Sequence, residues 1–238
     1  VNCFFDSSTN GVLIDKTVDF TFTGSWFSNR PGNGCVISNS TGTSFIGCSF
    51  INSAKHGCLV QSTAARTSFN DCKFISNSTS SSGAFNGLTI GANTNDFSVV
   101  GCEFTNGMGF PSTQRNGIDI GAGTSNRYTL TSNNVTGNLN LGIANGGTGA
   151  EQYVTDNIGH RTKNSGTADV TFNVHGVGTI PHGLAVVPKY ATAFALSAGA
   201  VETTITSVSS TNITLRQRVT TSDANQSGNY FIMWSAEA

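Results

Sequence analysis

The sequence predicts an all-β protein: a right-handed parallel β-helix of about six coils, followed by a small antiparallel β-sandwich. Three observations predict it. Residues 1–156 repeat a pattern every 23 to 30 residues, each repeat holds three short alternating segments, and after Asp156 the pattern gives way to a different set of strands. The composition agrees. The 28 glycines and the abundant Ser, Thr and Asn favour turns. The 16 phenylalanines and the 37% of hydrophobic residues give the chain more apolar surface than a disordered chain carries.

Each repeat contains three segments in which apolar and polar residues alternate, as in a strand. The first segments are tripeptides like Cys-Ser-Phe, and they begin at Cys3, Ser25, Cys48, Cys72, Cys102 and Asn133. The second segments resemble Gly-Cys-Leu-Val, and they begin at Gly11, Gly34, Gly57, Gly87, Gly117 and Gly142. The third segments end at Gly24, Gly47, Asp71, Gly101, Ser132 and Asp156. Three strands per repeat predict one coil, in which each strand pairs with its equivalent in the next coil at ~4.8 Å.

All six cysteines fall on ladders of inward side chains in this alignment. One ladder holds Cys3, Cys48, Cys72 and Cys102, and a second holds Cys35 and Cys58. Because the aligned positions elsewhere carry Val, Leu, Ile or Ser, we expect small buried hydrophobes with free thiols. The spacings lack the paired C-x-x-C type of a zinc site, so we expect neither a metal nor a cofactor. His56, just before Gly57, is expected in a solvated turn.

Two repeats are longer than the others, and insertions in a solenoid form surface loops that often carry its function. The additions are residues 76–87 and 105–117, which we call the two long turns. Lying one coil apart, they should sit side by side and present Phe85, Phe110 and Arg115 among many hydroxyls and amides. Aromatic faces with short polar groups suit a sugar. The alternative is that they are ordinary loops, with the phenylalanines packed onto the coil.

Outward positions of the first coils are apolar where a monomer would expose them. On the second strand these are Leu13, Val36 and Leu59, and a subunit interface is the simplest explanation. On the first strand, Phe4 and Trp26 also need a cover, which could be another subunit, further chain or a glycan. Trp26 is therefore a candidate glycan contact.

Two outward acids near the long turns, Asp119 and Glu103, are the candidate catalytic residues. Glycoside hydrolysis needs two carboxylates about 5 to 9.5 Å apart. Since these two lie on different strands of neighbouring coils, the sequence does not ensure a shared site. We therefore favour binding over catalysis for this chain, with hydrolase or lyase activity on a polysaccharide as the alternative.

Charge and hydropathy exclude two classes of partner. Lys and Arg total 12 against 13 Asp and Glu, without a basic stripe, so nucleic acid is not expected. No apolar run approaches the ~20 residues of a membrane helix, so membrane insertion is not expected. Val1 opens inside a repeat, and we expect a piece of a longer protein whose first coils precede it.

After the β-helix, residues 157–168 are polar and predict a linker, and residues 169–238 predict a small antiparallel sandwich. The runs GTIPHGLAVVPKYATAFAL, STNITLRQR and GNYFIMWSAEA resemble the C-terminal modules of bacteriophage tail fibres and tailspikes. The matching positions are His182, Gly183, Leu184 and Trp234, which we interpret as turn and core residues. The preceding repeats resemble the pectin-lyase-like shaft of tailspikes in architecture.

The resemblance implies a homotrimer in which the C-terminal module caps the shaft and helps to register the chains. It implies a virion protein acting at the host cell surface, joined to the rest of the phage tail through its N-terminal part. The expected function is binding of a bacterial surface polysaccharide, either capsule or O-antigen. The alternatives are a polysaccharide depolymerase on the same β-helix, or a structural shaft and trimerisation tip.

Overall fold

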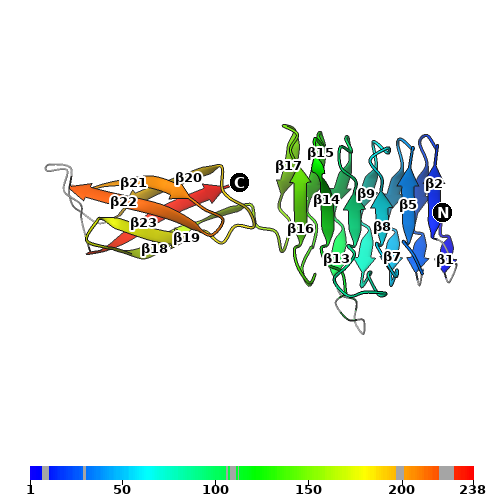
Figure 1. Cartoon of the computed structure of the whole chain (residues 1–238), viewed down its shortest axis with the longest axis horizontal. Helices are drawn as coiled ribbons and strands as arrows, with labels where there is room; N and C mark the ends of the chain where they lie inside the picture. The colour runs from blue at the N-terminus through cyan, green and yellow to red at the C-terminus, as the bar shows by residue number, and fades with distance from the viewer. Residues whose placement is uncertain are drawn as a thin grey trace. The chain divides into compact units, whose positions relative to one another are not determined.

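The chain forms two compact units, residues 1–160 and 161–238. The computed structural model describes residues 1–6, 11–28, 31–105, 107, 111, 113–196, 201–219 and 228–238. Within them no helix is long and apolar enough to cross a membrane. Strands make up the regular structure of both units (Figure 1).

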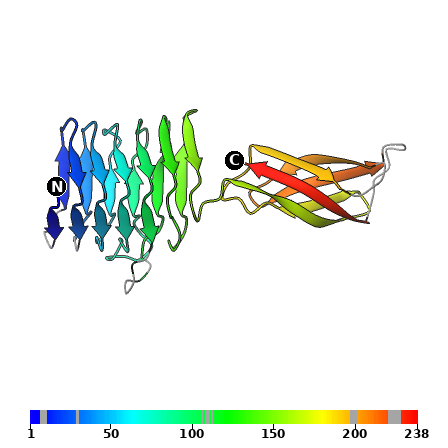
Figure 2. The same ribbon diagram turned by 180° about the vertical axis from the view of Figure 1, so that it is seen from behind.

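Three parallel sheets run along the first unit, as a parallel β-helix requires. The first sheet contains β1 (Phe4–Asp6), β4 (Trp26–Ser28), β7 (Ser49–Ile51), β10 (Lys73–Ile75) and β13 (Glu103–Thr105). The second contains β2 (Val12–Asp15), β5 (Cys35–Ser38), β8 (Cys58–Val60), β11 (Leu88–Ile90), β14 (Ile118–Gly123) and β16 (Ile143–Gly147). The third contains β3 (Thr21–Thr23), β6 (Ser44–Ile46), β9 (Ser68–Asn70), β12 (Ser98–Val100), β15 (Tyr128–Thr131) and β17 (Gln152–Thr155). Figure 2 shows the stacked strands from behind.

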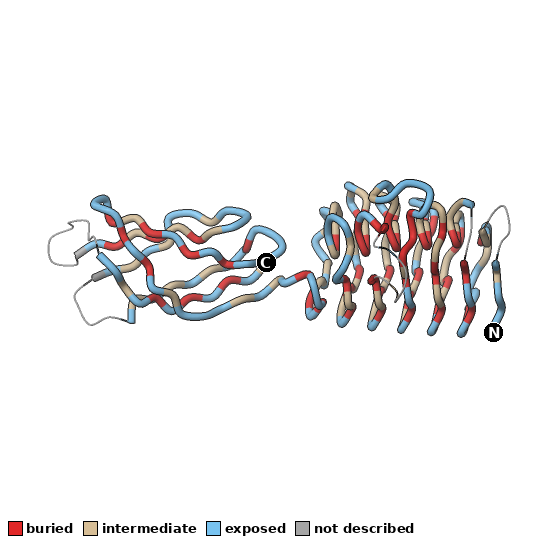
Figure 3. The backbone as a smooth tube through the Cα atoms, turned by 90° about the horizontal axis from the view of Figure 1, so that it is seen from below, coloured by how far each residue is buried: buried red, intermediate tan, exposed pale blue. Residues whose placement is uncertain are grey.

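The coil register is the one that the repeat alignment predicts. In the second sheet, the outward positions pair in the order Leu13, Val36, Leu59, Thr89, Asp119 and Ala144. Buried and half-buried residues alternate along these strands (Figure 3), because successive side chains of a strand point to opposite faces. The fold prediction for this unit is confirmed.

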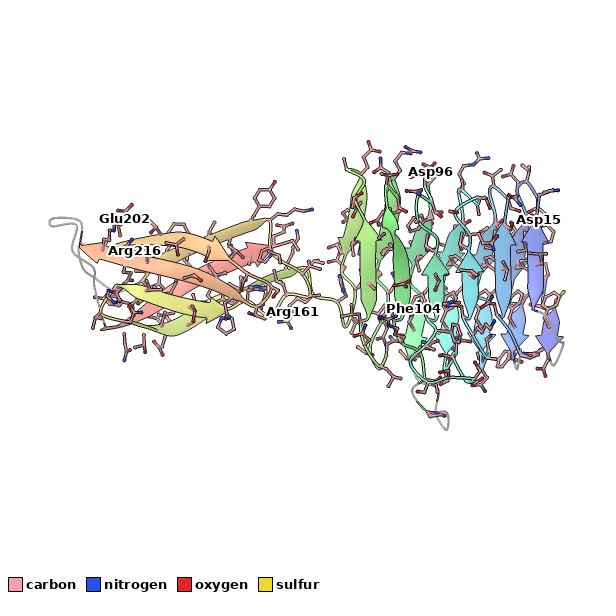
Figure 4. The ribbon with its side chains drawn as sticks, viewed as in Figure 1. Asp15, Asp96, Phe104, Arg161, Glu202 and Arg216 are labelled. Carbon is pink, nitrogen blue, oxygen red and sulfur yellow. The ribbon has the colours of Figure 1, made fainter. Side chains whose placement is uncertain are left out.

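Phenylalanine stacks fill the interior of the coils. Phe27, Phe50, Phe74 and Phe104 are fully buried, and neighbouring rings lie 4.5 to 4.7 Å apart and within 8° of parallel. Figure 4 labels Phe104, the last of this stack. A second stack from the third sheet, Phe22, Phe45 and Phe69, meets the first one edge to face at 5.4 to 6.2 Å. Both geometries are the favourable ones for aromatic pairs.

One residue in the left-handed conformation makes the corner between the third strand of a coil and the first strand of the next. These residues, all at φ between +53° and +65°, are Asn2, Gly24, Gly47, Asp71, Gly101, Ser132 and Asp156. Glycine, asparagine and aspartate tolerate this conformation best. The third-segment ends found in the repeat are therefore corners, which explains why they are rich in Gly and Asp.

All six cysteines are free thiols, as predicted, and all except Cys3 are buried inside the coils. Cys35, Cys48, Cys58, Cys72 and Cys102 are buried, and a hydrogen bond with Cys102 raises the pKa of Cys72 to about 12. Cys3 is exposed, because within the described residues only the following coil covers it. Further along, Asn133 and Asn157 replace cysteine on the same ladder.

The second unit is a sandwich of two three-stranded antiparallel sheets. The fourth sheet has the order β18 (Lys163–Phe172), β23 (Gly228–Glu237) and β20 (Tyr190–Ala195). The fifth has the order β19 (Val177–Pro181), β22 (Asn212–Val219) and β21 (Val201–Val208). A core of its own, which includes Val170, Phe172, Ile213, Leu215 and Ile232, lies between them. This confirms the predicted antiparallel sheet part.

The expected turn and core residues of this unit lie where the motif suggested. Leu184 and Trp234 are buried, and Gly183 has φ +61°. His182 is fully buried, its Nδ1 accepts the amide of Leu184 at 3.0 Å, and its Nε2 lies 3.1 Å from the carbonyl of Ser209. The imidazole therefore bridges two turns of the sandwich.

The boundary between the units is narrower than the linker expected at 157–168. Asn157 and Ile158 still belong to the β-helix, since Asn157 is a buried rung of the Cys/Asn ladder and Ile158 bridges to Asn134. At the other side, β18 already begins at Lys163. Polar composition suggested a linker because the buried asparagine amide and the solvent-facing side of a sandwich strand are both polar.

The phenylalanine stack gives a stability prediction. Replacing Phe50 with Ala removes a fully buried ring between two others, and we expect the free energy of unfolding to fall by about 3 to 5 kcal/mol. Denaturant unfolding followed by circular dichroism measures it. Phe20, which is 45% exposed, supplies the control Phe20→Ala. An equal loss in both variants would contradict the central role of the stack.

Candidate functional site

The two long turns lie side by side, as predicted. The amide of Gly83 donates to the carbonyl of Thr113 at 2.8 Å, and the amide of Arg115 donates to the carbonyl of Phe85 at 2.7 Å. Two predicted site residues, Phe85 and Arg115, are thus held together by the backbone. Phe110, the third, lies outside the described residues.

A buried amide ladder anchors the bases of the two turns. Asn77 and Gln114 are almost fully buried, and the Asn77 Nδ2 donates to Gln114 Oε1 at 2.7 Å. Gln114 Nε2 in turn donates to Asn138 Oδ1 at 3.0 Å, and Asn138 Nδ2 donates to the Phe104 carbonyl at 2.9 Å. Because unpaired buried amides are costly, each turn has to start and end in register with this ladder.

A second ladder precedes the glycine that opens each strand of the second sheet. Asn33, His56, Asn86 and Asn116 each accept, through the side chain, the amide hydrogen of the equivalent residue in the next coil, at 3.1 to 3.2 Å. The following glycines are required for this approach: a Cβ on Gly57 would lie 2.6 Å from the carbonyl oxygen of Gly87. The recurring Asn-Gly and His-Gly pairs are the sequence signal for the ladder.

His56 is part of this ladder, so the expectation of a solvated turn residue was wrong. Its Nδ1 accepts the amide of Asn86 at 3.1 Å, and Thr89 Oγ1 lies 2.8 Å from the same nitrogen. Nδ1 is therefore unprotonated, the hydroxyl donates to it, and the proton of the neutral ring sits on Nε2. Burial, with the charge of Lys55 adding to it, lowers the pKa of His56 from 6.5 to about 4.

Phe85 packs against this histidine. The two rings meet edge to face at 5.2 Å, and the amide of Phe85 donates to Ser78 Oγ at 3.0 Å. Phe85 is half-buried. It is therefore neither the fully exposed ring expected of a sugar-binding loop nor the fully packed ring expected of an ordinary loop. Asn86 Nδ2 donates to Thr89 Oγ1 at 2.9 Å, which completes a continuous chain of contacts from the long turn to strand β11.

Asp119 stands next to Thr89 in the outward column of the second sheet. The carboxyl is half-buried, and Asn116 Nδ2 donates to its Oδ1 at 3.3 Å. Burial raises its pKa, while the Asn116 hydrogen bond and the charge of Arg115 act in the opposite direction. Asp119, Thr89, Phe85, His56 and Arg115 therefore form one surface, which we call the turn site.

The other candidate residues lie elsewhere. Glu103 is on β13 of the first sheet, where its Oε1 accepts the Thr105 hydroxyl at 2.8 Å, so it faces out of a different sheet from Asp119. Trp26 is also on the first sheet, 38% exposed, and stacks on Phe4 at a ring distance of 6.3 Å. Neither residue shares a sheet with the turn site.

The apolar column that the sequence indicated continues directly into the turn site. Leu13 is 65% exposed, whereas Val36 and Leu59 are half-buried, and Leu59 pairs with Thr89 on the neighbouring strand. The outward face of the second sheet thus changes from apolar to polar at β11. A neighbouring molecule that covered Leu13, Val36 and Leu59 would end at Thr89, where the turn site begins.

The turn site offers complementary groups for a hydroxylated ligand. It combines an aromatic ring, an exposed guanidinium, a half-buried carboxyl and a neutral imidazole. Donors and acceptors of this kind, placed beside an apolar face, bind polyols and sugars. Among the residues that the structure describes, no three His, Cys, Asp or Glu side chains are grouped so that they could hold a metal ion.

The fold and this site define a parallel β-helix protein with insertions on one face and a C-terminal sandwich module. No protein-family model and no curated protein sequence matches the chain. Solved structures do, and several are phage tailspikes. The chain is similar to the tailspike gp49 of Pseudomonas phage LKA1, at 12% identity over 98% of this chain and 61% of that one, with a TM-score of 0.36.

Two further tailspikes are similar to it. The Dettilon tailspike gp208 has 11% identity over 91% of this chain and 56% of that one, with a TM-score of 0.43. The Gp54 tailspike of Acinetobacter baumannii bacteriophage AP22, solved in complex with an A. baumannii capsular saccharide, has 8% identity over 91% and 50% respectively, with a TM-score of 0.39. The chain thus spans between 50% and 61% of the length of these three proteins.

The His56 contacts predict a dependence of stability on pH. The pKa is lower in the folded chain, so the unfolded chain binds the proton more tightly and folding stability falls as the pH drops from about 6.5 to about 4. Above this window the imidazole is neutral in both the folded and the unfolded chain, so His56 causes no change of stability with pH. The variant His56→Asn keeps a side-chain acceptor on the ladder without the titration, so its loss over the same window should be smaller. Denaturant midpoints at pH 7 and pH 4.5 measure both.

Other groups titrate in both proteins, so the comparison between them isolates His56. Hydrogen exchange at the Asn86 amide, which donates to the imidazole, adds a local measurement. The protection factor of this amide, relative to its intrinsic exchange rate at each pH, should fall at pH 4.5 in the wild type alone. Equal pH dependence in wild type and variant would contradict the ladder role of His56.

Proposed function

We propose that the chain is the distal part of a phage tailspike or tail fibre that binds a bacterial surface polysaccharide, capsule or O-antigen, through the turn site. In this proposal it acts on the virion at the host cell surface. The remainder of the phage tail would attach through the N-terminal part of the protein. The motif in residues 169–238 supports the phage assignment.

The observation that carries the binding proposal is the backbone and amide anchoring of the two long turns. Phe85 and Arg115 come from different coils, and a hydrogen bond from the Arg115 amide to the Phe85 carbonyl fixes their separation. Below them, Asn77 and Gln114 hold the turn bases. Turn backbones that are anchored before the ligand arrives lower the entropy cost of binding a flexible glycan.

We further propose a homotrimer in which the column Leu13, Val36 and Leu59 lies against a neighbouring chain. Leu13 exposes 65% of its surface, and the column is continuous over three strands. Burial of such a column would contribute roughly 25 cal/mol for each Å² of apolar surface removed from water. The polar turn site would then stay accessible beside the interface.

A depolymerase is the second candidate function, and one observation favours it. Burial raises the pKa of the half-buried Asp119 carboxyl, which stands next to Thr89 in the outward column, and a carboxyl with a raised pKa can serve as a general acid. Glu103 on the first sheet would not act with it in one site. A structural shaft and trimerisation tip is the third reading, in which the turn site binds nothing.

Substitutions at the turn site test the three functions. Binding is measured with the fluorescently labelled chain on a panel of encapsulated and O-antigen-bearing bacteria. Phe85→Ala and Arg115→Ala should each weaken the affinity by at least about tenfold, which corresponds to about 1.4 kcal/mol of binding free energy. Phe20→Ala and Arg218→Ala are matched controls, because both residues are exposed and lie outside the turn site. Unchanged binding in both turn-site variants would overturn the proposal in favour of the structural tip.

The same polysaccharides distinguish binding from cleavage. A bound polysaccharide that gains no reducing ends and no unsaturated products supports a binding protein. Release of either product, lost in Asp119→Asn, would establish the depolymerase instead. Asp119→Asn keeps the shape of the side chain and removes the ionisable group, so its fold is expected to be unchanged.

The trimer is tested by mass in solution. Light scattering should give about three times the monomer mass of 24.7 kDa for the wild type, and a smaller mass for Leu13→Glu, because a charge in the apolar interface is costly to bury. Ile46→Glu is the control, since Ile46 is 42% exposed on the third sheet. A monomeric wild type at micromolar concentration would overturn the trimer.

A further inference from the structure

One side of the turn site is a column of a cation, an aromatic ring and a second cation. Lys55, Phe85 and Arg115 each stand two positions before the glycine that opens a strand of the second sheet. Successive coils are in register at these glycines, with about 4.8 Å between neighbouring strands. The Lys55 carbonyl accepts the amide of Ser78, at the base of the first long turn, at 2.8 Å. The two cations therefore lie on either side of the ring, one coil away from it.

The protein itself does not neutralise these two cations. The side chains of Lys55 and Arg115 are exposed, and neither forms an ion pair with a residue that the structure describes. By contrast, Arg127 of the same unit is paired with Asp96, with 2.6 Å between Nε and Oδ1. The column thus presents two positive charges whose partners are left to solvent or to a ligand.

The sequence keeps acids away from this column. Neither Asp nor Glu occurs in the turns that join the first sheet to the second in these coils: residues 52–57, 76–87, 105–117 and 136–142. The one acid of the turn site, Asp119, lies on strand β14, half-buried, and accepts a hydrogen bond from Asn116 at 3.3 Å. The imidazole of His56 is neutral, since its pKa is lowered to about 4. The turn site is therefore locally positive, although residues 1–160 together are slightly acidic.

We propose that the turn site selects an acidic polysaccharide, one whose repeating unit carries a carboxylate or a phosphodiester. This inference rests on the proposed function and names the substrate class for the same site. Phe85 would stack on a sugar ring, and an anionic substituent at the edge of that ring would meet a cation of the neighbouring coil. The fork of the Arg115 guanidinium fits a carboxylate or a phosphate in a bidentate way, whereas the Lys55 ammonium acts as a point charge.

The separation of the cations favours a charged polymer over a neutral one. Lys55 and Arg115 stand two coils apart, about 10 Å between their backbones, so both can engage one chain that carries an anionic group in each repeating unit. A neutral glycan laid across Phe85 would take the neighbouring charges partly out of water without giving them a partner, which costs free energy. An anionic glycan supplies that partner.

A glycan array probed with the full chain tests the substrate class. One set of spots carries capsule and O-antigen oligosaccharides with uronic acids, each printed beside its carboxyl-reduced form, and a second set carries phosphodiester-linked oligosaccharides. We expect at least about tenfold stronger retention of the acidic form than of its reduced partner. Retention should also weaken between about 0.1 M and about 1 M salt, because the screening length shortens from about 10 Å to about 3 Å.

Charge variants assign the effect to the column. Arg115→Gln should lower the retention of acidic glycans at least about tenfold and Lys55→Gln at least about threefold, while Arg115→Lys should lose less than Arg115→Gln. Lys73→Gln is the matched control, because Lys73 is exposed on the first sheet and lies outside the turn site. It should bind as the wild type does. Circular dichroism verifies that each variant is folded.

The remaining outcomes separate this inference from the proposed function. Equal retention of acidic and carboxyl-reduced glycans, lost in Phe85→Ala, would keep the turn site as a glycan site and refute its choice of an acidic ligand. Acidic retention that Lys55→Gln and Arg115→Gln leave unchanged, or that Lys73→Gln lowers equally, would also refute it. Retention confined to the phosphodiester set would support the inference and identify phosphate as the anionic group. A chain that retains no glycan at all would overturn both.

Discussion

The fold of the first unit depends on one constraint: each strand residue lies one strand spacing away from its equivalent in the next coil. A side chain must therefore suit the side chain above it as well as the solvent or core that it faces. Like stacks on like for that reason. Phenylalanine rings repeat at 4.5 to 4.7 Å, and asparagine amides pass hydrogen bonds along the stack. Glycine recurs where the backbones of successive coils approach most closely.

The same constraint builds the turn site. An inserted turn of any length must end at the position where the next strand of the second sheet begins. The side-chain acceptor before each glycine fixes that position through its hydrogen bond to the next coil. Asn86 and Asn116 close the two long turns in equivalent positions, so Phe85 and Arg115 arrive next to each other. Histidine at position 56 serves where other coils use asparagine, because its Nδ1 is an equally good acceptor when the ring is neutral. This substitution ties the protonation of one side chain to the anchoring of a long turn.

The C-terminal unit follows another rule. Antiparallel strands with one buried face leave the other face free to take any character, and here the two sheets differ. The fifth sheet carries cross-strand charges, whereas the fourth carries aromatic rings around a row of hydroxyls. Packing of the core requires neither arrangement, since the buried residues that form it are Val, Ile, Leu, Phe, Ala and Trp on the inner faces.

The sequence by itself determined the coil count, the register and the inward and outward faces, because a period of two within strands and a repeat between coils leave only one alignment. Leu13, Val36, Leu59 and Asp119 stand in the column that this alignment predicts. The tertiary structure alone decided which polar residues are structural. His56, Gln114 and Asn157 look like solvated turn or linker residues, yet each is held against backbone groups 24 to 37 positions away in the chain. Such hydrogen bonds depend on distances of 3 Å between atoms of different coils, which the pattern within a single repeat does not specify. The recurrence of Asn-Gly and His-Gly pairs signals only the ladder of His56.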